Sequence, residues 1–245
     1  MENSTMLQGF YHSIDTFGAV DGRGIRYVLF LSGCELGCEF CHNPDTWEQG
    51  RNTISVEEIL KDIRRYRRFY DASNGGITVS GGEPLLQADF VAELFKHCRR
   101  ENVHTTLDTS GYAPQNAIRK VLPYSNAVLF SLKAANSATH RKLTGKDNAL
   151  ILNNLNLAAS LSKVTVRYVI IPGINNSHAE ITDLSKIIRK LPQLVAVELL
   201  PYHTLGRSKW DQLGKPYPLP GIPPADENDV HQVRQWLQDK NIITC

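Results

Sequence analysis

The sequence predicts an α/β fold, an open partial (β/α)6 barrel of parallel strands with an added N-terminal strand or hairpin. Six short runs of β-branched and apolar residues occur along the chain, and they are nearly continuous, as in strands buried on both faces of a sheet. Segments with helical periodicity separate these runs, and such alternation favours a parallel sheet. Six units are two short of a closed eightfold barrel. The predicted strands are 26–32, 76–80, 104–108, 127–132, 164–171 and 195–200.

The segments around these strands complete the predicted fold. Residues 7–20 predict the added N-terminal strand or hairpin. The first helix is expected to follow Ser55, whose hydroxyl forms a capping box with the Glu58 carboxylate. A second helix has an apolar face that includes Cys98, and a third is expected to begin at Pro114. Further apolar helical faces consist of Leu152, Leu155 and Ala159, of Ile181, Leu184 and Ile188, and of Val230, Val233 and Leu237.

Length and composition indicate one large domain, residues 1–245, in a protein of 245 residues with a net charge of +2. A chain of this length can bury a sizeable core without disulfide bonds. The small net charge gives no general attraction to nucleic acid or to anionic lipid. The sequence has no apolar run near the roughly 18 residues of a membrane span, and its first residues do not resemble a secretory signal. We therefore expect a soluble, cytoplasmic protein that acts as a monomer.

Three of the five cysteines, Cys34, Cys38 and Cys41, lie within eight residues in a loop at 33–47. In a reducing compartment such a cluster indicates metal binding or catalysis. Three thiolates can hold three corners of a four-iron cubane cluster and leave the fourth iron for a small molecule. Zinc held with His42 as a fourth ligand is an alternative, although adjacent Cys41 and His42 would chelate awkwardly. That alternative describes a zinc-binding interaction module without catalysis.

Polar residues follow the predicted strands at one end of the sheet. The cysteine loop follows the first strand, Gly81–Glu83 the second, and Lys133 the fourth, while Asp108 closes the third. His203 follows the sixth strand, and Arg167 lies within the fifth. In parallel α/β barrels the functional groups sit at the carboxyl ends of the strands. The sequence therefore predicts an active site at this end.

These motifs resemble a known superfamily. Cys-x3-Cys-x2-Cys with Phe40 before the last cysteine, followed by Gly-Gly-Glu-Pro at 81–84, is similar to the radical S-adenosylmethionine superfamily. Segments 21–26, 41–47 and 201–203 resemble its glycyl-radical-enzyme activases of the pyruvate formate-lyase-activating type, and the similarity covers nearly the whole chain. One alternative is an activase of another glycyl-radical enzyme, but such activases commonly carry a ferredoxin-like insertion that this sequence lacks. Another alternative is an enzyme of the superfamily that acts on a small molecule, which segments 21–26 and 41–47 disfavour.

The resemblance implies an oxidoreductase of anaerobic glucose metabolism. It implies one [4Fe-4S] cluster on Cys34, Cys38 and Cys41 and S-adenosylmethionine as the second cofactor. Reduced flavodoxin or ferredoxin would supply an electron, and reductive cleavage of S-adenosylmethionine would give a 5′-deoxyadenosyl radical. That radical would remove a hydrogen atom from one glycine of pyruvate formate-lyase, the protein substrate.

The resemblance also assigns cofactor-binding residues. Gly81, Gly82 and Glu83 would bind the methionine amino group, with the glycines allowing close approach of the backbone. Lys133, after Ser131 and Leu132, would pair with the methionine carboxylate. The other expected cofactor contacts are Phe40, Cys41, His42, Asp108 and His203. A Gly-Gly pair is usually a turn, and a lone lysine or histidine is usually solvated or structural, so these assignments depend on the motifs around them.

The remaining assignments concern the partner and a cation. Asp21 and Arg167 resemble residues that hold the glycine loop of the partner. Asp108 and Thr109 resemble ligands of a monovalent cation, but Ser131 stands where the family typically has a third, aspartate ligand. A hydroxyl dipole holds a hard cation less strongly than a carboxylate. Outside the site, Arg26 and Asp45 are expected to form a structural ion pair, Cys98 to lie in the core, and Cys245 to have no role.

Overall fold

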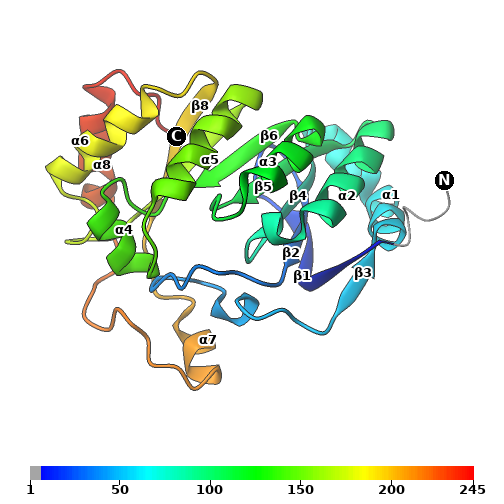
Figure 1. Cartoon of the computed structure of the whole chain (residues 1–245), viewed down its shortest axis with the longest axis horizontal. Helices are drawn as coiled ribbons and strands as arrows, with labels where there is room; N and C mark the ends of the chain where they lie inside the picture. The colour runs from blue at the N-terminus through cyan, green and yellow to red at the C-terminus, as the bar shows by residue number, and fades with distance from the viewer. Residues whose placement is uncertain (1–6) are drawn as a thin grey trace. The chain divides into compact units, whose positions relative to one another are not determined.

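The computed structural model describes residues 7–245, and within them eight strands form one sheet in the order β3-β1-β2-β4-β5-β6-β7-β8 (Figure 1). The end strands β3 (Thr53–Ser55) and β8 (Leu194–Pro201) are not neighbours, so the described sheet is open. This confirms the predicted α/β fold. Contacts group the chain into unit 1, which comprises the residues up to Glu35 and Thr46–Leu129, and unit 2, which comprises Leu36–Asp45 and Phe130–Cys245.

Unit 1 contains the antiparallel edge of the sheet and the first parallel strands. β1 (Gln8–Gly18) pairs antiparallel with β2 (Arg26–Leu31) and with β3, which confirms the added N-terminal strand. β2, β4 (Gly76–Gly81) and β5 (His104–Thr109) run parallel. Each of these three strands lies within about a residue of its predicted bounds.

Three helices of unit 1 follow its strands, namely α1 (Val56–Ser73), α2 (Ala88–Arg100) and α3 (Gln115–Val121). Ser55 and Glu58 form the predicted capping box, with Glu58 N–H donating to Ser55 Oγ at 3.2 Å and Ser55 N–H donating to Glu58 Oε2 at 2.8 Å. Pro114 is the N-cap of α3 and precedes its first residue by one position, a small correction to the prediction. Short 3-10 turns lie at Pro44–Thr46, Pro84–Gln87 and Leu122–Tyr124.

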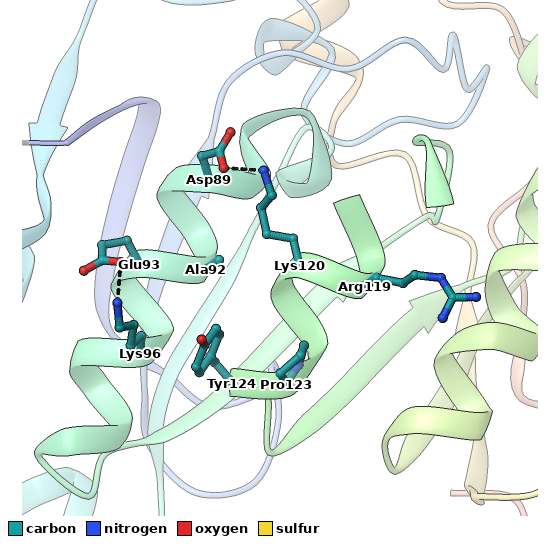
Figure 2. A pocket seen from close by; sticks show the side chains of 8 residues that line it. All are labelled: Asp89, Ala92, Glu93, Lys96, Arg119, Lys120, Pro123 and Tyr124. Atoms are coloured by element: carbon teal, nitrogen blue, oxygen red, sulfur yellow. Dashed lines mark hydrogen bonds and ion pairs between the residues drawn. The ribbon is translucent and has the colours of Figure 1, made fainter. Parts of the chain in front are cut away.

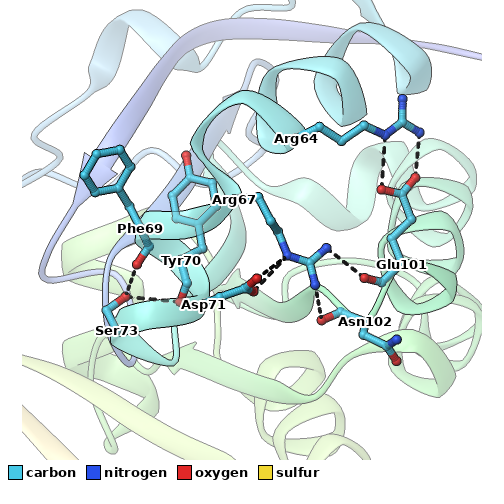
Figure 3. Close-up of polar contacts among 8 residues, drawn as sticks. All are labelled: Arg64, Arg67, Phe69, Tyr70, Asp71, Ser73, Glu101 and Asn102. Atoms are coloured by element: carbon cyan, nitrogen blue, oxygen red, sulfur yellow. Dashed lines mark hydrogen bonds and ion pairs between the residues drawn. The ribbon is translucent and has the colours of Figure 1, made fainter.

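Arginines on the outer face of α1 tie that helix to the end of α2 (Figure 3). Arg64 donates to both carboxylate oxygens of Glu101, at 2.6 and 3.2 Å. Arg67 donates to the carbonyl oxygen of Glu101 at 2.8 Å and forms an ion pair with Asp71 at 2.8 Å. Because these groups are partly exposed, each contributes little stability individually. Together they fix how α1 and α2 are aligned.

Unit 2 carries parallel strands and five helices. β6 (Ala127–Ser131) leads into it, and β7 (Val164–Ile170) pairs parallel with β8. Its helices are α4 (Ser137–Thr144), α5 (Ala149–Leu161), α6 (His178–Ile188), α7 (Arg207–Gln212) and α8 (Glu227–Gln238). The sequence analysis missed α4 and α7 because helices of eight and six residues are too short to show a periodic apolar face. The stretch 214–224 is a loop before α8.

One face of the unit 1 sheet carries polar groups on β4 and β5, which the near-continuous apolar runs did not predict. Along β4, Ile77 and Val79 alternate with Thr78 and Ser80 on the opposite face, where β2 contributes Arg26 beside the apolar Val28 and Phe30. On that polar face Arg26 is fully buried. It donates to Thr78 Oγ1 at 2.9 Å and to Thr106 Oγ1 at 2.8 Å, and burial lowers its pKa to about 10.

Arg26 and Asp45 each have other partners in place of the expected ion pair. Arg26 is held by hydroxyl and carbonyl oxygens of β4 and β5. Asp45 pairs with Lys209 at 3.1 Å, within unit 2. Cys98 is fully buried in α2, as predicted. In the part of the chain that the structure describes, helices long and apolar enough to cross a membrane are absent.

Candidate active site

The base of the cysteine loop is fixed within unit 1 by backbone hydrogen bonds. Gly33 N–H donates to the Thr46 carbonyl at 2.8 Å, and Cys34 N–H donates to the Trp47 carbonyl at 2.9 Å. These two bonds join the ascending and descending arms of the loop. The first cysteine therefore has a defined backbone position directly after β2.

The other two cysteines lie in the part of the loop that belongs to unit 2. Cys38 is 8% exposed, and Cys41 N–H donates to the Cys38 carbonyl at 3.0 Å in a tight turn. Burial raises the pKa of Cys38 to about 11, an effect that the nearby Lys133 charge opposes. Burial therefore favours the neutral thiol, and a thiolate at such a site needs a positive charge beside it. The five cysteines, all within residues 7–245, form no disulfide.

Helices α4 and α7 hold this part of the loop. Glu39 N–H donates to the Leu143 carbonyl at 2.9 Å, at the carboxyl end of α4. From α7, Trp210 Nε1–H donates to the Cys41 carbonyl at 3.0 Å, and Lys209 Nζ donates to Asn43 Oδ1 at 2.8 Å. The sequence analysis assigned no role to Lys209 or Trp210. Nothing in their local pattern could have revealed these contacts, because more than 160 residues separate them from the loop.

Four expected cofactor contacts of unit 2 form two close pairs. The Lys133 ammonium lies 5.8 Å from the centre of the Phe40 ring, within range of a cation–π attraction. The rings of His42 and His203 are 3.8 Å apart between centres, and His42 Nε2–H donates to the His203 carbonyl at 3.3 Å. Burial lowers the pKa of both imidazoles, and His42 further lowers that of His203. Both rings are therefore favoured in their neutral form.

The two glycines of the Gly-Gly-Glu motif are required by neighbouring backbone. A Cβ at Gly81 would lie 2.2 Å from the Leu31 carbonyl oxygen, and one at Gly82 would lie 2.1 Å from that of Gly33. Gly81 also has φ +113°, a conformation that favours glycine. The motif therefore packs against the end of β2 and the first residue of the cysteine loop. This structural demand is a second reason for glycine, besides the expected approach to the methionine moiety.

The Glu83 carboxylate is buried and fully engaged in hydrogen bonds within unit 1. Oε1 accepts from Leu85 N–H at 3.1 Å and from Thr109 Oγ1–H at 2.6 Å. Oε2 accepts from Ser110 N–H at 2.9 Å and from Ser110 Oγ–H at 2.6 Å. Burial raises the pKa of Glu83, and these donors oppose that shift. Glu83 thus joins the end of β4 to the end of β5.

The residues expected at the cation and partner sites have partners of their own. Asp108 accepts from Ser80 Oγ at 2.8 Å, and Thr109 donates to Glu83. Arg167 Nε pairs with Glu198 Oε2 at 2.6 Å, and the neighbouring Leu132 N–H donates to the Arg167 carbonyl at 3.0 Å. The Asp21 carbonyl accepts from Thr78 Oγ1 at 2.6 Å. Ser131 is half-buried at the end of β6.

Residues of α2, of α3 and of the turn after it line a hollow in unit 1 (Figure 2), and the lining includes none of the predicted site residues. Its charged lining includes an ion pair between Asp89 and Lys120 and another between Glu93 and Lys96, at 3.3 Å. Charges of both signs pair across this surface.

Among residues 7–245, no group of three His, Cys, Asp or Glu side chains could hold a single metal ion. In a cubane cluster each cysteine ligates a different iron, so the ligands need not converge on one point.

Comparison with known proteins defines the class. The family model of the Radical SAM superfamily matches residues 28–184. A radical SAM methyltransferase from Sphaerobacter thermophilus, 21% identical, has the same fold, with a TM-score of 0.66 over 93% of this chain and 70% of that chain. The chain is thus an α/β enzyme of the radical SAM type.

More similar relatives define the family. A pyruvate formate-lyase-activating enzyme from Listeria monocytogenes is 41% identical over 242 residues, which are 96% of this chain and 98% of that protein. The pyruvate formate-lyase 1-activating enzyme of Escherichia coli is 38% identical and covers 94% of this chain and 95% of its own. A solved domain of a pyruvate-formate lyase-activating enzyme from Bacteroides vulgatus is 26% identical, with a TM-score of 0.59 over 70% of this chain and 98% of that chain. The chain belongs to the pyruvate formate-lyase-activating enzymes of the radical SAM superfamily. Its cofactors are therefore a [4Fe-4S] cluster and S-adenosylmethionine.

The hydrogen bonds of Glu83 predict the effect of Glu83→Gln. The amide Nε2–H of the glutamine would face the Ser110 N–H in a buried site, so two donors would meet and the Ser110 N–H would lose its acceptor. We expect the free energy of unfolding to fall by about 1–3 kcal/mol, the cost of a buried unsatisfied group. Urea unfolding monitored by circular dichroism measures this change. Glu57→Gln, at an exposed ion pair with Arg64, is the matched control and should change stability by less than about 0.5 kcal/mol. If both variants lost the same free energy of unfolding, the hydrogen bonds of Glu83 would not be what stabilises this region.

Proposed function

We propose that this protein activates pyruvate formate-lyase by generating a glycyl radical in it. The observation that carries the proposal is the cysteine loop. Its three thiols are spaced as in the radical SAM motif, and its base is tied by backbone hydrogen bonds. Relatives that match nearly the full length of the chain are named for this activity.

The residues on the chain fit both cofactors. We assign Cys34, Cys38 and Cys41 as the three protein ligands of a single [4Fe-4S] cluster. When bound, the cluster and S-adenosylmethionine together supply the radical chemistry that removes a hydrogen atom from a glycine Cα. The protein's own contribution is to bind, to orient and to exclude water.

Unit 2 provides side chains suited to S-adenosylmethionine. Lys133 offers a positive charge to the methionine carboxylate, and its neighbour Phe40 offers an apolar ring. The neighbouring rings of His42 and His203, whose pKa values are lowered, offer hydrogen bonds without placing another positive charge beside the sulfonium. In unit 1, the Gly81–Glu83 segment offers backbone groups whose position Glu83 fixes.

Further assignments extend the proposal. Asp21 and Arg167 hold the glycine loop of the partner, and reduced flavodoxin or ferredoxin supplies the electron. Asp108 and Thr109 hold a monovalent cation, weakly because Ser131 lacks a carboxylate. The protein acts as a monomer in the cytoplasm, a compartment in which thiols stay reduced. Residues 1–245 act as one radical SAM domain, since the family model spans parts of both units.

The proposal predicts a directly observable product. The reduced protein, mixed anaerobically with S-adenosylmethionine and pyruvate formate-lyase, should produce a glycyl-radical signal in electron paramagnetic resonance. Cleavage of S-adenosylmethionine without that signal would show that another glycyl-radical enzyme or a small molecule is the substrate. One zinc per chain and no iron after anaerobic purification would contradict the enzymatic function altogether.

The ligand assignment predicts which cysteines are essential. Serine at position 34, 38 or 41 removes a thiolate ligand, so each variant should lose cluster iron and cleavage of S-adenosylmethionine. Cys98→Ala and Cys245→Ser should keep both, because Cys98 is buried in α2 and Cys245 is at the exposed end of the chain. Iron per chain after anaerobic reconstitution, with 5′-deoxyadenosine formed, measures the outcome. A comparable loss in Cys98→Ala would mean that the ligands are misassigned.

Arg167 and Lys133 should separate partner activation from cofactor binding. Arg167→Ala should retain cleavage of S-adenosylmethionine but lose glycyl-radical formation by about tenfold or more, as expected when a charge-assisted hydrogen bond is removed. Lys133→Ala should weaken both activities, because it removes the charge that pairs with the methionine carboxylate. Parallel assays of 5′-deoxyadenosine and of the radical signal compare the variants. If Arg167→Ala and Lys133→Ala both failed to bind S-adenosylmethionine, the assignment of Arg167 to the partner and Lys133 to the cofactor would be refuted.

A further inference from the structure

Three residues of the segment that follows β8, Gly206, Lys209 and Trp210, contact the part of the cysteine loop in unit 2. Lys209 binds Asn43 at 2.8 Å and Asp45 at 3.1 Å. Trp210 binds the Cys41 carbonyl at 3.0 Å. Gly206 lies so close to His42 that a Cβ there would be 2.8 Å from the His42 Cα. A segment with contacts at residues 41, 42, 43 and 45 leaves this part of the loop little freedom.

Trp210 is the buried member of this contact. It is 4% exposed, and its hydrogen bond to the half-buried Cys41 is partly shielded from water. Its ring meets Tyr217 edge-on at 5.8 Å between centres, and the Tyr217 hydroxyl lies 2.5 Å from that of the buried Tyr202. Tyr202 directly follows β8. The indole is therefore anchored to the sheet and cannot move away from Cys41 without repacking.

We propose that Trp210 is a positioning residue of the cluster site that fixes Cys41 and raises the reduction potential of the cluster. The inference rests on the proposed function, since it takes Cys41 as a cluster ligand. It goes beyond that function because it assigns a role to Trp210, which acts through the backbone of the proposed ligand Cys41.

The sign of the effect follows from the charge that reduction adds. One-electron reduction makes a thiolate-ligated cluster more negative. The Cys41 carbonyl oxygen carries partial negative charge and belongs to a residue that would ligate the cluster. The indole N–H binds this oxygen in a part-buried position, where such dipoles act more strongly than in water. Removing the N–H leaves the oxygen without its donor, so the reduced cluster becomes less favourable. Hydrogen bonds around ligands are known determinants of cluster potentials and metal affinity.

Trp210→Phe, which keeps an aromatic ring but removes the N–H donor, tests the proposal. The midpoint potential of the reconstituted cluster should be more negative than in the wild type, as measured by a redox titration followed by electron paramagnetic resonance. Iron transfer to a chelator should be faster by about tenfold. Trp236→Phe is the matched control, because Trp236 is half-buried in α8 against His178, and it should change neither quantity.

A second variant protects the test against misfolding. Site-specific replacement of Trp210 by 3-benzothienyl-alanine exchanges the indole N–H for sulfur and nearly preserves the ring shape. It should lower the potential as Trp210→Phe does. An unchanged potential in this isostere would overturn the proposal and assign Trp210 to packing alone. Wild-type protein without iron would instead refute the proposed function, so the two failures are distinguishable.

Discussion

The contact between the end of β4 and the start of the cysteine loop is the constraint on which the site in unit 1 depends. Glu83 N–H donates to the Gly33 carbonyl at 2.8 Å, and Gly82 approaches the same carbonyl so closely that a Cβ would lie 2.1 Å away. Two strand ends that are neighbours in the sheet are thus locked together by backbone alone. Cys34 follows directly, and Glu83 then ties the same region to the end of β5 through Ser110. The proposed cluster ligand Cys34 and the proposed cofactor-binding segment Gly81–Glu83 therefore share one rigid frame.

Charge and hydration shape the site as strongly as geometry. The buried thiol of Cys38 has a pKa raised to about 11, and burial lowers the pKa of His42 and His203. An iron cluster supplies the positive charge that stabilises a thiolate in such surroundings. Neutral imidazoles suit a cationic cofactor, because they donate and accept hydrogen bonds without repelling a sulfonium. The directions of these three pKa shifts are consistent with one another and with the chemistry of the family.

The polar face of the unit 1 sheet shows how an enzyme departs from a purely apolar core. Arg26 lies fully buried on this face and bonds to threonine hydroxyls of β4 and β5. Thr78 in turn donates to the Asp21 carbonyl, so the loop after β1 is held by the same network. Buried polar groups are tolerated when every member is satisfied. The result is a sheet in which one face combines polar groups of β4 and β5 with Arg26, Val28 and Phe30 of β2.

The sequence by itself determined the strands, most helices and the chemistry of the cysteine loop. Apolar runs mark the parallel strands, the Ser55 capping box marks a helix start, and the Cys-x3-Cys-x2-Cys spacing marks the cluster loop, because all three are local patterns. The tertiary structure alone decided that Trp210 contacts Cys41 and that Glu83 is held by Ser110. Such contacts join residues distant along the chain, and they form only where packing brings a donor and an acceptor together in a buried place. Local patterns record which chemistry a chain can perform, whereas the fold decides which side chains hold that chemistry in position.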